Sequence, residues 1–130
     1  MHLLNTSTLR TQEFVPGKIP GYLILSHRWR DQEISYKTLK EHSNDLSSHP
    51  GWPKITSFCS LAKNEGWEWA WMDTCCIDKS SSAELSEAIN SMYRWYQNAD
   101  LCIAHLSDIF VVKEEPGVKR QLFVESEWFK

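Results

Sequence analysis

The stretch that decides the fold reads Trp69-Ala70-Trp71-Met72-Asp73-Thr74-Cys75-Cys76-Ile77-Asp78-Lys79. It begins as an apolar run that ends in an aspartate, which is typical of the carboxyl end of a buried strand. A polar turn and the start of a helix follow. In open α/β sheets, ligands bind at the carboxyl ends of the strands. We therefore expect a ligand-binding site at this edge of the sheet, which we call the rim. Its candidate residues in this stretch are Asp73, Cys75, Asp78 and Lys79.

Two more apolar runs, residues 22–25 and residues 101–106, predict strands on either side of this one in the chain. Apolar residues at helical spacing predict a helix over 53–65, which opens with a proline, and a second helix over 83–98. Strands that alternate with helices pair in parallel through right-handed crossovers. The sequence therefore predicts a single α/β domain with a mostly parallel sheet.

The remaining segments are less regular. Residues 1–20 predict a peripheral hairpin that closes at Pro16-Gly17, and residues 31–50 predict a long, partly helical loop. Ser81 and Glu84 form a Ser-x-x-Glu capping box, in which each side chain accepts a hydrogen bond from a backbone N–H at the helix start. The helix after the deciding stretch is therefore expected to begin at about residue 83.

Composition excludes several functions. A chain of 130 residues can bury about two-thirds of its unfolded surface. Its net charge of −3 argues against binding nucleic acid. No apolar run approaches the roughly 18 residues of a membrane span, and no signal peptide is present, so a soluble, cytoplasmic protein is expected.

The chain has neither a dinucleotide fingerprint nor a phosphate-binding loop, and its histidines and cysteines lack zinc-ligand spacing. No metal and no cofactor are expected.

The four cysteines are expected to be reduced and mostly buried, because two of them are adjacent and the others fall inside a helix and a strand. Cys75-Cys76 has two readings. The pair could supply a reactive thiol, since a following helix N-terminus lowers a nearby pKa. Alternatively, the two residues are small apolar groups that close the strand.

The first predicted strand ends in a polar loop that we expect to reach the same rim. Its candidate residues are Ser26, His27, Arg28, Trp29 and Asp31.

Several of these residues could have a structural role instead of binding a ligand. His27 could be a hydrogen-bonded loop residue, and Asp73 could accept N–H groups of its own turn. Arg28 and Arg30 could hold a phosphate or carboxylate in a bidentate fork, or pair with nearby carboxylates such as Glu33.

Taken together, residues 22–29, 55–63, 71–79 and 81–96 resemble the fungal heterokaryon incompatibility (HET) domain, with the run from Asp73 to Lys79 the most specific. The resemblance covers residues 1–130 and implies a cytoplasmic protein that acts in self/non-self recognition and programmed cell death. In the loop, Arg28 and Arg30 stand where the family usually has threonine and glycine.

The family resembles Toll/interleukin receptor (TIR) domains distantly, which implies a flavodoxin-like, three-layer sandwich around a mostly parallel sheet. Residues 126–128 resemble the start of the TIR helix that carries the catalytic glutamate in members that hydrolyse NAD. This resemblance implies that the glutamate would lie beyond Lys130 and that the domain is incomplete at its C-terminal side.

The expected function is therefore incompatibility signalling through induced assembly, with protein partners or further copies of the chain. Two alternatives stay open. One is a TIR-like enzyme with NAD as the substrate of the complete domain, and the other is an inactive gene fragment.

Overall fold

The computed structural model describes residues 1–42 and 45–105. The segment 126–128, which carries part of the TIR resemblance, lies outside the described residues. The elements, in chain order, are β1 (His2–Asn5), β2 (Thr11–Glu13), β3 (Leu23–His27), α1 (Tyr36–Glu41), the 3-10 helix η1 (Leu46–Ser48), α2 (Trp52–Asn64), β4 (Trp69–Trp71), α3 (Ser82–Asn98) and β5 (Leu101–His105).

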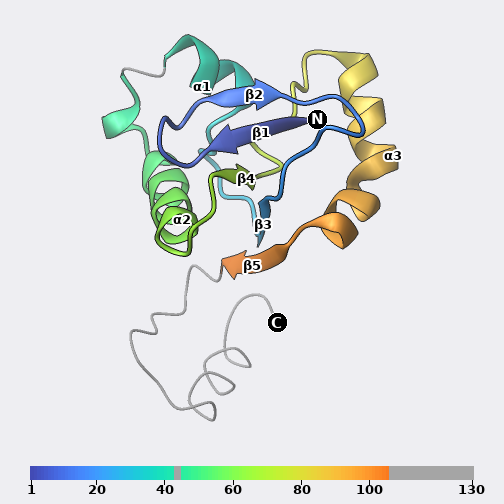
Figure 1. Ribbon diagram of the computed structural model, residues 1–130. Helices are drawn as coiled ribbons and strands as arrows, with labels where there is room; N and C mark the ends of the chain where they lie inside the picture. The colour runs from blue at the N-terminus through green and yellow to red at the C-terminus, as the bar shows by residue number, and fades with distance from the viewer. Residues whose placement is uncertain (43–44, 106–130) are drawn as a thin grey trace, which may run out of the picture.

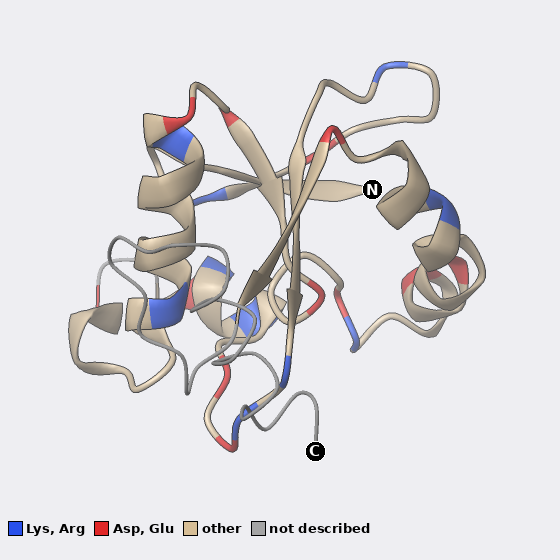
Figure 2. Cartoon of the chain, turned by 90° about the horizontal axis from the view of Figure 1, so that it is seen from below, with Lys and Arg blue, Asp and Glu red and all other residues tan. Residues whose placement is uncertain are grey.

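The five strands form one sheet in the order β2-β1-β4-β3-β5. β3 pairs in parallel with β4 and with β5, as the alternation of strands and helices predicts. β1, however, pairs antiparallel with both β2 and β4. The α/β class is confirmed, but the sheet is mixed rather than mostly parallel. α2 and α3 lie on opposite sides of it (Figures 1 and 2).

The N-terminal hairpin differs from the prediction in both its turn and its place. The chain reverses between Asn5 and Arg10, where the Asn5 side chain accepts from the N–H groups of Ser7 and Thr8. This side-chain turn closes the hairpin well before Pro16-Gly17. The hairpin is not peripheral, because Leu3 and Leu4 are fully buried and β1 pairs with β4.

The core is built around Trp71, which is fully buried in β4. Its ring makes edge-to-face contacts with Trp95 and Tyr96 of α3, at centroid distances of 5.7 and 5.8 Å. α2 covers the sheet from the other side with Ile55, Phe58, Cys59 and Ala62. Leu61, one of the apolar residues of this helix, is exposed.

The strand ends and the cysteines differ only slightly from expectation. β5 lies at the edge of the sheet and leaves Leu101 about half exposed, so it is not a core strand. Residue 106 of the predicted strand lies outside the described residues. Cys59, Cys75 and Cys76 are buried free thiols, whereas Cys102 is an exposed one. Among the described residues, no helix has the length and apolar character needed to cross a membrane.

The start of α3 confirms half of the capping box. Ser81 Oγ accepts from the Glu84 N–H at 3.3 Å, and the helix begins at Ser82. The Glu84 carboxylate does not return to Ser81. It accepts from the Asp78 N–H at 2.5 Å and lies 2.7 Å from His2 Nδ1, so it joins the turn before the helix to β1.

Replacing Ser81 with alanine is expected to lower the free energy of unfolding by about 1 kcal/mol, because the Glu84 N–H loses its acceptor. Urea unfolding followed by circular dichroism measures the change. Ser86→Ala, an exposed position inside the same helix, is the control and should be neutral or slightly stabilising. Equal effects of the two substitutions would contradict the capping role.

Candidate functional site

The site begins where two neighbouring parallel strands end. His27 is the last residue of β3, and Asp73 follows β4 by two positions. His27 Nε2 lies 2.7 Å from Asp73 Oδ1, and Trp29 Nε1 donates to Asp73 Oδ2 at 2.9 Å. The expected convergence of the two strand ends is therefore confirmed for these three side chains, and both carboxylate oxygens of Asp73 are engaged.

Lys79 holds the loop that follows β4 against this group. Its Nζ donates to the backbone carbonyls of Asp73 at 2.6 Å and Thr74 at 3.2 Å. It also lies 4.9 Å from the centroid of the Trp29 ring, within the range of a cation–π contact. Burial lowers the pKa of Lys79, against the opposing effect of the Asp73 charge. Lys79 thus binds backbone and indole together.

An ion pair between Lys54 and Glu33 lies on the other side of the His27 imidazole. It was not predicted from the sequence. Lys54 Nζ donates to His27 Nδ1 at 3.1 Å and to the Arg28 carbonyl at 3.2 Å, and it forms a short ion pair with Glu33. An ammonium group only donates, so Nδ1 accepts and the proton of His27 sits on Nε2, toward Asp73. The side chains form one chain of contacts, Glu33–Lys54–His27–Asp73–Trp29, called here the rim network.

The rim network is largely buried except for Trp29, which is half exposed. The side chain of His27 is 1% exposed and those of Lys54 and Glu33 are 11% and 10% exposed. Burial alone would raise the pKa of Asp73, but the hydrogen bonds from His27 and Trp29, together with the charge of Lys79, outweigh it and lower that pKa. The network therefore favours a charged Asp73.

The lowered pKa of Asp73 predicts a stability that depends on pH. A carboxylate with a lower pKa in the folded state stabilises the fold above its unfolded pKa, which is about 3.9, and loses that contribution as the pH falls through the folded value. We expect the difference in unfolding free energy between the parent chain and Asp73→Asn to shrink from pH 6 to pH 3. Urea unfolding at both pH values measures it. A difference that grows toward low pH would contradict this sign.

Part of the predicted rim lies beside the network rather than in it. Ser26 is half-buried in β3, in register with Ala104 of β5. Beyond the strand end the chain lines an open hollow of about 560 Å³. Its lining residues are Arg28, Trp29, Arg30, Asp31, Gln32 and Pro50. The backbone N–H of Arg30 donates to Glu33, which ties this hollow to the network.

Two predicted rim residues are not brought to the network. Asp78 Oδ1 accepts from the N–H and hydroxyl of Ser80, so this carboxylate orders the turn before α3. Cys75 is fully buried, and the contact with Cys76, with burial, raises its pKa well above the usual value. A raised pKa favours the reading of Cys75 as a small core residue over that of a reactive thiol.

Comparison with known proteins identifies the family. The family model described as Heterokaryon incompatibility protein (HET) matches residues 22–126. The chain belongs to the HET family. The matched region contains every residue of the rim network, whereas β1 and β2 precede it. The resemblance that the deciding stretch carries is therefore confirmed.

A relative of known sequence also supports membership of the HET family. Vegetative incompatibility protein HET-E-1 of Podospora anserina is 43% identical to the chain over 125 residues. The alignment covers 92% of this chain and 9% of the relative, so the chain spans only a small part of that protein. No solved structure matches the HET chain.

Proposed function

We propose that this chain is a signalling domain of heterokaryon incompatibility that triggers cell death when copies of it are brought together. Family membership is the observation that carries this proposal. The relative HET-E-1 is far longer than the aligned region, which suits a module that other parts of a larger protein control.

The exposed side of α3 supports assembly as the trigger. Ile89 is 66% exposed and Tyr93 is 80% exposed, and the two residues are one helical turn apart. Large apolar side chains at such spacing suit a contact with another protein surface, including that of a second copy. We call Ile89 and Tyr93 the α3 patch.

Forced clustering tests the proposal. The parent protein that carries this chain is fused to a chemically induced dimerisation module and expressed in fungal cells. We expect cell death after the inducer is added, and survival without it. Cells that stay healthy despite confirmed clustering would refute the proposal.

The α3 patch has its own test. The double variant Ile89→Ser with Tyr93→Ser should associate less in sedimentation velocity and should need more inducer to cause death. Asn90→Ser, an exposed change on the same helix outside the patch, is the control. Equal association of the double variant and this control would remove the patch from the proposal.

Cleavage of NAD is a second candidate function, favoured by the hollow beside the strand ends. Two arginines and the half-exposed Trp29 ring suit a ligand that carries phosphates and a flat base. In this alternative, a longer HET domain supplies the glutamate of the TIR-like chemistry.

NAD loss over time distinguishes the two candidates. A longer version of the domain, clustered, should consume NAD if the enzyme alternative holds, and Arg28→Gln with Arg30→Gln should slow it. Unchanged NAD in clustered cells that nonetheless die would leave signalling by assembly alone.

A further inference from the structure

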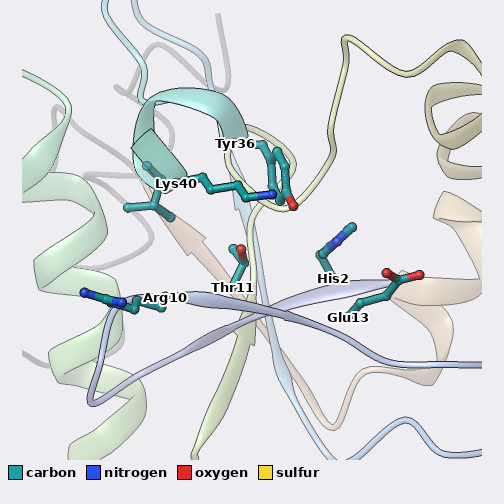
Figure 3. Close-up of a pocket in the computed structure, with 7 residues that line it drawn as sticks. His2, Arg10, Thr11, Glu13, Tyr36 and Lys40 are labelled. Atoms are coloured by element: carbon teal, nitrogen blue, oxygen red, sulfur yellow. The ribbon is translucent and has the colours of Figure 1, made fainter. Parts of the chain in front are cut away.

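A second cavity lies away from the rim network, between the N-terminal hairpin and α1. It has a volume of about 390 Å³, within the usual range for small-molecule sites. Its lining residues are His2, Arg10, Thr11, Glu13, Tyr36, Leu39 and Lys40 (Figure 3). It shares no lining residue with the hollow at the strand ends.

The hairpin register places the polar groups on one face. His2 pairs with Glu13, and Leu4 pairs with Thr11, so these side chains project from the same side of the two strands. Across the cavity, Tyr36 and Lys40 are one turn apart on α1. The hairpin and the helix therefore form two facing walls.

Contacts to other elements hold these walls in place. The His2 ring lies 4.9 Å from the Tyr36 ring, and its Nδ1 lies 2.7 Å from the Glu84 carboxylate of α3. Leu39, a residue of α1, is buried and packs that helix against the core. The aromatic surface of the cavity is thus largely pre-formed, which reduces the entropy lost on binding.

Charge is unevenly placed in the cavity. Figure 3 shows Arg10 and Lys40 toward one end with Thr11 between them, and His2 and Glu13 toward the other. Lys40 Nζ lies 5.8 Å from the Tyr36 ring centroid. Within residues 1–42 and 45–105, the guanidinium of Arg10 makes no hydrogen bond or ion pair. One end offers two cations and a hydroxyl, and the other a carboxylate.

We propose that this cavity binds a phosphorylated small molecule with a flat, amine-bearing body, of the nucleoside monophosphate class. The phosphate lies between Arg10 and Lys40 and accepts charge-assisted hydrogen bonds from both, which are stronger than bonds between neutral groups. The Thr11 hydroxyl is a further donor. The flat base packs against Tyr36 and His2. Glu13 accepts from an exocyclic amine of the base. This site is independent of the proposed signalling function.

Titration of the complete chain with AMP tests this inference, with adenosine and inorganic phosphate as separate arms. Binding is followed by ¹⁵N–¹H NMR shifts and by calorimetry. We expect saturable AMP binding with the largest shifts in residues 2–13 and 36–41. Adenosine and phosphate should each bind at least tenfold more weakly than AMP.

Charge variants locate the site. Arg10→Gln and Lys40→Gln should each weaken AMP binding by about tenfold, the loss of one charge-assisted contact. Lys37→Gln, an exposed residue of the same helix outside the cavity, removes the same charge and should leave AMP binding unchanged. Circular dichroism confirms that each variant is folded.

Glu13→Ala, which removes the acceptor of the base's amine, separates the two ends of the ligand. It should weaken AMP and leave phosphate binding unchanged. No saturable AMP binding, equal affinity for AMP and phosphate, or AMP binding that Lys37→Gln weakens as much as Lys40→Gln would each overturn the inference.

Discussion

Trp71→Ala is expected to lower the free energy of unfolding by about 3–5 kcal/mol, the largest effect of any single change considered for this chain. Trp71 is fully buried, and its loss removes the edge-to-face contacts with Trp95 and Tyr96 that join β4 to α3. Domains are stable by only about 5–15 kcal/mol, so this variant should be close to unfolded at 37 °C. Thermal and urea unfolding followed by circular dichroism measure the loss.

Two further variants separate packing from other effects at this position. Trp71→Phe should cost clearly less than Trp71→Ala, because it keeps an aromatic ring and removes an indole N–H that is buried without a hydrogen-bond partner in the described structure. Tyr93→Ala removes a ring that is 80% exposed and should change stability by less than about 0.5 kcal/mol. A loss at Tyr93 comparable with that at Trp71 would contradict the assigned core.

Asp73→Ala should destabilise the fold by about 2–4 kcal/mol at pH 7. The substitution removes the acceptor of both the buried His27 Nε2–H and the Trp29 indole N–H. His27 then keeps its contact with Lys54 at Nδ1 but has lost the carboxylate at Nε2. Urea unfolding at pH 7 measures the change.

Asp73→Asn should cost less than Asp73→Ala, since one amide oxygen can still accept from one of the two donors. Asp31→Ala, an exposed aspartate of the neighbouring loop, serves as the control and should change stability by less than about 0.5 kcal/mol. If Asp73→Ala and Asp31→Ala proved equal, the rim network would not stabilise the chain.

The proposed signalling function gives the rim network a second test. The network fixes the loop that follows β3 through Trp29, and this loop lines the open hollow. Lys79 ties the loop that follows β4 to the same Trp29 ring. Asp73→Asn in the clustered parent protein therefore separates two roles. Death that persists in a folded Asp73→Asn protein would assign the network to stability alone.

Local signals in the sequence were enough for much of the fold. The alternation of apolar runs with helical spacing determined the α/β class, the strand of Trp71 and the helix that follows it. Ser81 marked the start of α3, because a side-chain cap depends only on residues three positions apart. The convergence of His27 and Asp73 also followed from sequence, since parallel neighbouring strands end at one edge of a sheet.

Only the tertiary structure decided the pairings between distant segments. β1 pairs with β4 although Leu4 lies 66 positions before its partner Ala70, and this antiparallel pairing makes the sheet mixed. Lys54 reaches His27 from the first turn of α2, and Glu84 reaches His2 from α3. Local propensity carries no information on such contacts, because their free energy comes from groups that meet only after the core has formed. The sequence by itself determined the α/β class, the central strands, the two long helices and the family, and the packed chain determined the place of the hairpin, the rim network and the cavity beneath α1.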